Sequence, residues 1–189
     1  MDALEAIVLA GGAGSRFGGG KLTHPWRGGA LIDGALAAAF AAPARTVTVV
    51  TGADPKVEDA ARRFAERIGE TSRLRVVHCA GHAEGMGATL RAGAASLPPD
   101  AAGAFVFLGD MPRVPAAVLA PLAAAPSHAG QRGHPVLFGA ALLPQLKALS
   151  GDAGAREVLK ALADRLALVA TDDPGVLVDI DRPGDLAAD

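Results

Sequence analysis

A glycine-rich loop that carries two cations follows the first apolar stretch of the chain. Residues 6–10 are continuously apolar, which is typical of a buried parallel strand. The glycines after this stretch let backbone N–H groups approach an anion closely. Arg16 and Lys21, placed among them, add charge and donors that suit phosphate oxygens. The pattern therefore predicts a phosphate-binding loop at the end of the first strand.

Two common phosphate-binding patterns do not fit this loop. The dinucleotide fingerprint G-x-G-x-x-G fails because Phe17 stands where its third glycine belongs. That fingerprint also requires an acidic residue at the end of the second strand, about 20 residues further on. Here the second predicted strand ends much later, near Gly52, so the spacing fails. The P-loop G-x-x-x-x-G-K-[ST] fails because Ser15 takes the place of its first glycine and Leu22 follows Lys21. What remains is L-A-G-G-x-G-x-R-F-G-x-x-K.

Carboxylates at two distant places in the chain are candidate metal ligands. Asp110 comes just after the apolar run 104–108, where open α/β folds bind ligands at the carboxyl edge of the sheet. A short carboxylate there suits Mg²⁺ that bridges triphosphate oxygens, although an aspartate in this position can also simply form a turn. Residues 176–181 are predicted to form a last strand, whose alternation places Asp179 and Asp181 on one face. We prefer Asp181 as the second carboxylate.

Composition limits the class of protein. The chain has 189 residues, of which 50% are hydrophobic and 20% are charged, so we expect one globular domain over residues 1–189. A net charge of -2 and few aromatic residues argue against a nucleic-acid partner. No apolar segment is long enough to span a bilayer, and the acidic start lacks the features of a signal peptide. We therefore expect a cytoplasmic protein without a membrane association.

The predicted elements must bring the glycine loop and the carboxylates together. Strands are predicted at residues 6–10, 46–50, 74–79 and 104–108, each followed by a helix, at 31–42, 54–68, 88–97 and 115–125. The second half is more irregular, with strands at 136–138, 166–170 and 176–181. One helix is predicted at 144–149, and another opens in the segment 150–156 and ends at residue 163. This βα order predicts an α/β fold, a three-layer sandwich with a mainly parallel sheet.

The glycine-loop pattern resembles the signature of the MobA-like NTP transferases, which attach a nucleoside monophosphate to a phosphorylated acceptor. Further strings match in the same order along the chain. Residues 85–93 resemble the family's G-M-x-x-x-L-R-x-G segment. Residues 181–186 close the chain and resemble the family's D-x-D-T-P-E-D-L ending, with Arg182 as a departure. The strings R-G-H-P-V-L-F at 132–138 and G-D-x-G-A-R at 151–156 resemble the molybdopterin cytidylyltransferase branch. The resemblance covers essentially the whole chain and implies a Rossmann-like, GT-A-like fold.

The resemblance also implies a role for individual residues. Catalytic roles fall on Arg16, Lys21 and Asp110, and Mg²⁺ binding falls on Asp110 and Asp181. The residues expected to contact the nucleotide are Leu9, Ala10, Gly11, Gly12, Gly14, Ser15, Arg16, Lys21, Gly85, Met86 and Gly109. The residues expected to contact the acceptor are Arg132, His134, Asp152 and Arg156. From the residues alone, His134 can equally be a structural histidine in a loop, and Asp152 a helix N-cap.

The expected reaction transfers CMP from CTP to a molybdopterin-type phosphate and releases pyrophosphate. GTP stays open, because cytidine-type relatives often read L-A-A-G where this chain reads Leu9-Ala10-Gly11-Gly12, as guanosine-type relatives do. A sugar-1-phosphate nucleotidyltransferase of the same fold is a second enzyme hypothesis. A non-catalytic nucleotide-binding chaperone for the cofactor is the alternative from another class, but it would not need Asp110 and Asp181. A molybdenum hydroxylase or its chaperone is a further candidate partner.

Overall fold

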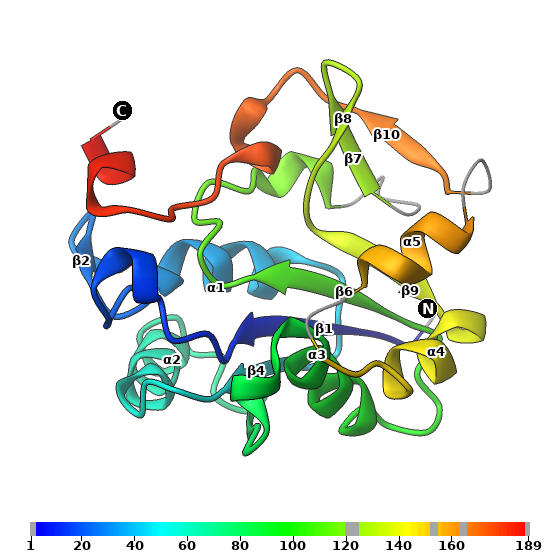
Figure 1. The fold of residues 1–189 in the computed structure, drawn as a ribbon, viewed down its shortest axis with the longest axis horizontal. Helices are drawn as coiled ribbons and strands as arrows, with labels where there is room; N and C mark the ends of the chain where they lie inside the picture. The colour runs from blue at the N-terminus through cyan, green and yellow to red at the C-terminus, as the bar shows by residue number, and fades with distance from the viewer. Residues whose placement is uncertain (1–2, 120–124, 152–154, 163–165, 188–189) are drawn as a thin grey trace.

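A five-stranded sheet forms the centre of the molecule. The computed structural model describes residues 3–119, 125–151, 155–162 and 166–187 (Figure 1). The strand order is β5 (Leu74–His78), β4 (Val47–Thr51), β1 (Leu4–Ala10), β6 (Gly103–Leu108) and β9 (Val136–Gly139). The first four strands are parallel, and β9 runs antiparallel to β6. The apolar run at 6–10 is buried along its whole length because β1 lies between two parallel neighbours.

Helices cover both faces of this sheet. One face packs against α1 (Ile32–Ala41) and α2 (Lys56–Arg67), and the other against α3 (Met86–Ala95), α4 (Leu143–Lys147) and α5 (Arg156–Leu162). Each face has its own hydrophobic core, with Leu36 and Phe64 in the first and Leu90 and Leu146 in the second. The predicted three-layer α/β sandwich with a mainly parallel sheet is therefore confirmed. Within the described ranges, no helix is long and apolar enough to cross a membrane.

Short elements complete the fold around the central sheet. β2 (Pro25–Trp26) and β3 (Gly29–Ala30) form a hairpin, and β10 (Leu168–Ala170), β7 (Ala125–His128) and β8 (Gln131–Arg132) form a small second sheet. Single 3₁₀ turns connect the larger elements, namely η1 (Ser15–Phe17), η2 (His82–Glu84), η3 (Ala116–Val118), η4 (Ala140–Leu142), η6 (Pro174–Leu177) and η7 (Pro183–Ala187). Figure 1 shows the C-terminal segment, in red, beside the blue N-terminal loop.

Two predicted elements of the second half are wrong. The helix expected over 115–125 is a 3₁₀ turn at Ala116–Val118, and Ala125 already belongs to β7; residues 120–124 lie outside the described ranges. Alanine is a strong helix former, but tertiary contacts override this propensity here, because Ala125 is fully buried where β7 pairs with β10. The strand expected over 176–181 is also absent: Pro174–Leu177 forms a 3₁₀ turn, and residues 178–181 join no sheet. The third helix begins at Met86, before its predicted start at residue 88.

Candidate functional site

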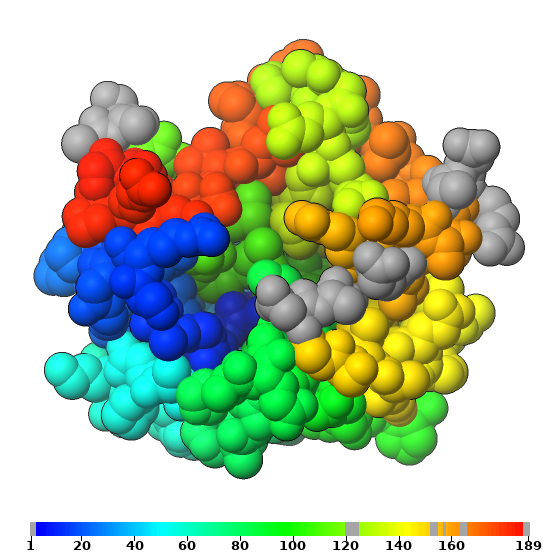
Figure 2. Space-filling model, viewed as in Figure 1, coloured from blue at the N-terminus to red at the C-terminus, as the bar shows by residue number. Residues whose placement is uncertain are grey.

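A cavity of about 540 Å³ opens at the carboxyl ends of β1 and β6. Figure 2 shows the hollow between the blue glycine loop and the green segment that begins α3. Its walls come from the loop after β1, from η2 and the start of α3, and from the end of β6. The lining residues are Leu9, Ala10, Gly11, Gly12, Ala13, Gly14, Lys21, Leu22, His82, Ala83, Gly85, Met86, Thr89, Leu108 and Asp110.

The glycine loop turns Lys21 into this cavity. Gly14 has a φ of 60°, in the left-handed region, and its carbonyl accepts hydrogen bonds from the N–H groups of Phe17 at 2.9 Å and Gly19 at 3.2 Å. A Cβ on Gly14 would lie 2.9 Å from the Cβ of Lys21. Glycine is therefore required both for the turn and for the close approach of the lysine. The lysine itself is only 8% exposed although it lines the cavity.

Lys21 lies between the two predicted metal ligands. Its Nζ is 2.8 Å from Asp110 Oδ2 and 3.4 Å from Asp181 Oδ1. Arg16 donates from Nη1 to the other oxygen of Asp181 at 2.7 Å. The structure thus brings together the two cations and the two carboxylates that the sequence singled out, from segments up to 165 residues apart.

Backbone contacts place the C-terminal carboxylate beside Asp110. The N–H of Ile180 donates to the carbonyl of Asp110 at 3.0 Å, so Asp181 follows directly after a residue tied to Asp110. The side chain of Asp185 then accepts from the N–H groups of Asp181 at 2.9 Å and Arg182 at 2.8 Å. This side-chain cap holds the turn. The position of Asp181 is set by these bonds instead of by the predicted strand.

Electrostatics differ between the carboxylates of this cluster. The hydrogen bond from Arg16 lowers the pKa of Asp181, and Lys21 lowers it further, so this carboxylate stays ionised. Partial burial raises the pKa of Asp179, and the negative charges of Asp110 and Asp181 raise it further. Asp179 is thus near the other two, although not through the shared strand face that the alternation predicted.

The chemistry of Asp110 and Asp181 fits a hard divalent cation. Their oxygens converge on one point, where the ammonium of Lys21 already occupies the position of a cation. Oxygen ligands are those that Mg²⁺ and Mn²⁺ prefer, and Mg²⁺ commonly takes one or two carboxylates together with substrate phosphates and water. Among the described residues, no group of three or more His, Cys, Asp or Glu side chains could hold a metal by itself. The set therefore suits a cation that is shared with a phosphorylated ligand.

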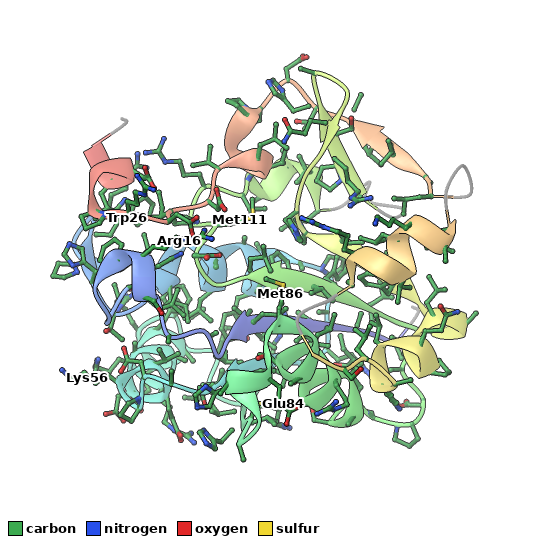
Figure 3. All side chains as sticks on the ribbon, viewed as in Figure 1. Arg16, Trp26, Lys56, Glu84, Met86 and Met111 are labelled. Carbon is green, nitrogen blue, oxygen red and sulfur yellow. The ribbon has the colours of Figure 1, made fainter. Side chains whose placement is uncertain are left out.

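Most residues predicted to contact the nucleotide line the cavity. The exceptions are Ser15 and Arg16 in η1 and Gly109, whose N–H donates to the carbonyl of Leu9 at 2.9 Å. Figure 3 shows Arg16 and Met86 on different sides of the opening, and the Met86 side chain is 47% exposed there. The sequence reasoning missed His82, Ala83, Thr89, Leu22, Leu108 and Ala13. Thr89 lies one helical turn after Met86, a spacing that predicts a shared helix face.

Thr89 packs against Gly11 at the floor of the cavity. A Cβ on Gly11 would lie 2.8 Å from Thr89 Oγ1 and 3.0 Å from Thr89 Cγ2. Real Cβ atoms do not approach other atoms at 2.8 Å without a shift of the neighbour. The space that an alanine methyl at position 11 would need is therefore filled by the threonine side chain.

The predicted acceptor residues are more dispersed than the nucleotide residues. His134 precedes β9, and burial lowers its pKa, so the imidazole is neutral near pH 7, while the charge of Asp110 opposes this shift. Its Nδ1 is buried without a hydrogen-bond partner in the described part of the chain. Arg132 in β8 and Arg156 at the start of α5 are exposed and lie outside the cavity lining. Asp152 lies outside the described residues.

Comparisons with known proteins agree with this geometry. A family model described as the MobA-like NTP transferase domain matches residues 6–166. The molybdenum cofactor cytidylyltransferase of Escherichia coli K12 is 26% identical over 192 residues, which covers 98% of this chain and 94% of that protein.

Solved structures show the same fold. Rv0371c from Mycobacterium tuberculosis H37Rv has a TM-score of 0.77 at 24% identity and covers 98% of this chain and 96% of its own. A nucleotidyl transferase from Methanothermobacter thermautotroptrophicus has a TM-score of 0.75 at 24% identity, with 99% and 95% coverage. Rv0371c has also been solved in complex with manganese, with a TM-score of 0.67 at 23% identity and with 91% and 89% coverage.

Proposed function

This chain belongs to the MobA-like NTP transferase family, and from that premise we propose that it transfers CMP from CTP to the phosphate of a molybdopterin-type acceptor. The observation that carries the proposal is the convergence of Lys21, Asp110 and Asp181 beside a cavity at the carboxyl ends of β1 and β6. The near-full-length similarity to a molybdenum cofactor cytidylyltransferase supports the choice of acceptor.

The proposed reaction is an in-line displacement at the α-phosphorus of the nucleotide. An ionised oxygen of the acceptor phosphate forms the new bond to this phosphorus. The bond from the α-phosphorus to the oxygen that bridges it to the β-phosphate breaks, and pyrophosphate leaves with that electron pair. Because the acceptor phosphate is already an anion near neutral pH, the reaction requires no general base. Lys21 and Arg16 are the cations that we assign to the charge developing on the α-phosphate and on the leaving pyrophosphate.

Asp110 and Asp181 are the residues that would hold a divalent cation. When bound, the cation would neutralise triphosphate charge and polarise the phosphorus–oxygen bonds. Arg16 keeps Asp181 ionised through its hydrogen bond of 2.7 Å, so this carboxylate is ready to bind a cation over a wide pH range. The manganese complex of Rv0371c, a protein of the same fold, supports the use of a divalent cation.

The packing of Thr89 on Gly11 supports CTP over GTP. The guanosine-like sequence Leu9-Ala10-Gly11-Gly12 would favour GTP if Gly11 made the cavity wider than an alanine does. Thr89 instead fills the space of that missing methyl group. The glycine therefore gives no extra room for a larger base, and the cytidylyltransferase-like remainder of the chain supports CTP.

We place the acceptor on the side of His134. A neutral imidazole can hydrogen-bond a polar heterocycle without adding a charge, and its Nδ1 has no partner within the described residues. Arg132, Asp152 and Arg156 remain proposed contacts to the acceptor, for which the nearby strings at 132–138 and 151–156 are the support.

Pyrophosphate release tests the proposal. Purified protein with Mg²⁺ and a molybdopterin acceptor is expected to release pyrophosphate with CTP at least about 10-fold faster than with GTP, ATP or UTP. Faster release with GTP would identify a guanylyltransferase instead. Turnover of hexose 1-phosphates would show that the acceptor is a sugar phosphate and not a molybdopterin. Saturable nucleotide binding without release under any acceptor would identify a non-catalytic chaperone.

The Gly11–Thr89 packing has its own test. Gly11→Ala alone is expected to weaken CTP binding at least about 10-fold, because the new methyl group displaces Thr89. Combining it with Thr89→Ala, which removes both contacting atoms, is expected to restore most of the affinity. An unchanged affinity in Gly11→Ala would remove this argument for CTP.

A further inference from the structure

The start of α3 contacts a segment that continues into the predicted acceptor residues. This segment, residues 149–151, follows α4 and leads directly to Asp152 and Arg156. In Figure 1 it passes in front of α3, although it is far from α3 in the sequence. Contacts between these two parts of the chain connect the wall of the nucleotide cavity to the acceptor side.

Gly87 makes the first contact. Its N–H, in the first turn of α3, donates to the carbonyl of Gly151 at 3.0 Å. A Cβ on Gly87 would lie 2.6 Å from that carbonyl oxygen and 3.0 Å from the carbonyl oxygen of Ser150. The first-turn N–H groups of a helix have no partner within the helix, so this one is used to hold the segment. Met86, the residue before it, lines the cavity.

Arg91 makes the second contact. Its Nη1 donates to the carbonyl of Leu149 at 2.8 Å, and its Nη2 is 3.3 Å from Glu84 Oε2. Glu84 is the last residue of η2, whose other residues His82 and Ala83 line the cavity. Figure 3 shows Glu84 on the side of this turn away from Met86 and the opening. One guanidinium therefore connects the cavity wall with the beginning of residues 149–151.

We propose that Arg91 is a positioning residue for the acceptor, acting with Gly87 to hold residues 149–151 against the nucleotide-side wall. Arg91 lies outside the lining of the cavity, so its effect passes through the carbonyl of Leu149. Met86, in the same first turn of α3 that holds Gly151, lines the cavity, so the nucleotide side and the acceptor side meet at this turn. This inference rests on the proposed function and adds to it a residue outside the cavity that positions the acceptor side of the site.

Arg73 supplies a matched control on another part of the molecule. Its Nη2 donates to the carbonyl of Ala44 at 2.8 Å, and its Nη1 is 3.3 Å from Glu70 Oε2. The same side-chain chemistry therefore joins two backbone segments at the opposite end of the sheet, away from the cavity lining. Arg73→Gln and Arg91→Gln each remove a hydrogen bond to a backbone carbonyl and an ion pair, and Arg73→Gln also removes a bond to the carbonyl of Phe40 at 3.3 Å. Of the two variants, Arg91→Gln removes a bond that leads to the acceptor segment.

Steady-state kinetics and hydrogen exchange test the inference together. Arg91→Gln is expected to raise KM for the acceptor about 10-fold, which corresponds to the loss of one hydrogen bond from a charged donor. The Kd for CTP is expected to change less than about twofold. Arg91→Lys is expected to recover part of this loss because an ammonium can still donate to the Leu149 carbonyl. Amide exchange at residues 149–151 is expected to become faster in Arg91→Gln and to stay unchanged in Arg73→Gln.

Three results would overturn the inference. The first is an equal rise of the acceptor KM in Arg91→Gln and Arg73→Gln. The second is a rise of the CTP Kd in Arg91→Gln that is as large as the rise of the acceptor KM. The third is unchanged amide exchange at residues 149–151 in Arg91→Gln. If the wild-type protein transfers no nucleotide at all, the proposed function fails. The comparison of amide exchange at residues 149–151 between the wild type and Arg91→Gln, made without substrates, still decides whether Arg91 holds the segment.

Discussion

The two ends of the central sheet carry nearly the same set of charged groups. At the amino end, Arg45 lies between Glu5 and Asp100. At the carboxyl end, Lys21 lies between Asp110 and Asp181. Each cluster joins segments that are far apart in the sequence, and each places one cation between two carboxylates. By residue type alone, the two clusters look equivalent.

Their surroundings separate them. Glu5 is completely buried, and it accepts hydrogen bonds from Arg45 Nε at 2.7 Å and from the N–H and hydroxyl of Thr46 at 3.0 and 2.6 Å. Arg45 also donates to both oxygens of Asp100, at 2.8 and 3.0 Å. The amino-end cluster is therefore saturated, and its bonds hold together the beginnings of β1, β4 and β6.

The carboxyl-end cluster keeps capacity for a ligand. Lys21 and Asp110 both line the cavity, and the Asp181 side chain is 42% exposed. The side chain of Arg16 is 74% exposed, which makes its ion pair a weak contributor to stability. The carboxyl-end cluster is a candidate site because two of its members line a cavity. The following substitutions test this contrast.

Asp110→Asn is expected to have the largest effect. Turnover should fall at least about 1,000-fold, because the neutral amide is a poor ligand for a divalent cation. The free energy of unfolding should change by less than about 1 kcal/mol, since Asp110 is partly exposed and lines the cavity. Pyrophosphate release and urea denaturation measure the two quantities. Activity above a tenth of the wild-type value would remove Asp110 from the proposed metal site.

Lys21→Met is expected to have the second-largest effect on activity. We expect a loss of about 100-fold in kcat/KM, typical of removing one group that stabilises charge in the transition state. Without the ammonium, Asp110 and Asp181 face each other, so Mg²⁺ should raise Tm more in this variant than in the wild type. Lys56→Met, which changes an exposed lysine on α2, is the control and should behave like the wild type. A Tm response to Mg²⁺ equal to that of the wild type would contradict the assignment.

Glu5→Ala is expected to lower stability and to leave activity nearly unchanged, the opposite of Asp110→Asn. Removing the buried carboxylate leaves the N–H and hydroxyl of Thr46 without an acceptor, which costs about 3 kcal/mol of unfolding free energy. Below the unfolding temperature, kcat/KM should stay within about twofold of the wild type, because a change far from the site alters the stability of the fold and not the groups that contact the substrates. Urea denaturation and initial rates provide the comparison. A large loss of activity in folded protein would show that the amino-end cluster has more than a structural role.

Asp100→Asn is expected to have the smallest effect, and one that depends on pH. The hydrogen bond from Arg45 lowers the pKa of Asp100 below its ordinary value. A carboxyl group with a lowered folded pKa contributes stability above its unfolded pKa of about 4 and loses it as pH falls through the folded pKa. The Tm difference between wild type and Asp100→Asn should therefore be small but measurable at pH 7 and should disappear near pH 2. A difference that persists at that pH would show that the pair acts through packing instead of charge.

Much of the first half of the molecule could be predicted from local pattern. Continuous apolar runs such as 6–10 and 104–108 became buried parallel strands, and Asp110 followed the second of them as expected. The second half resisted prediction because its short elements depend on distant partners. Ala125 is in a strand because it pairs with Leu168, and the segment before Asp181 is held by the carbonyl of Asp110.

The sequence by itself determined the fold class, the glycine loop with its cations, and the two aspartates as candidate ligands. Those features are local, because they depend on apolar periodicity, on glycine where the backbone must turn, and on side-chain chemistry. The tertiary structure alone decided that Lys21 lies between Asp110 and Asp181, and that Thr89 fills the space beside Gly11. These contacts join residues far apart in the chain, and their geometry depends on how the layers pack.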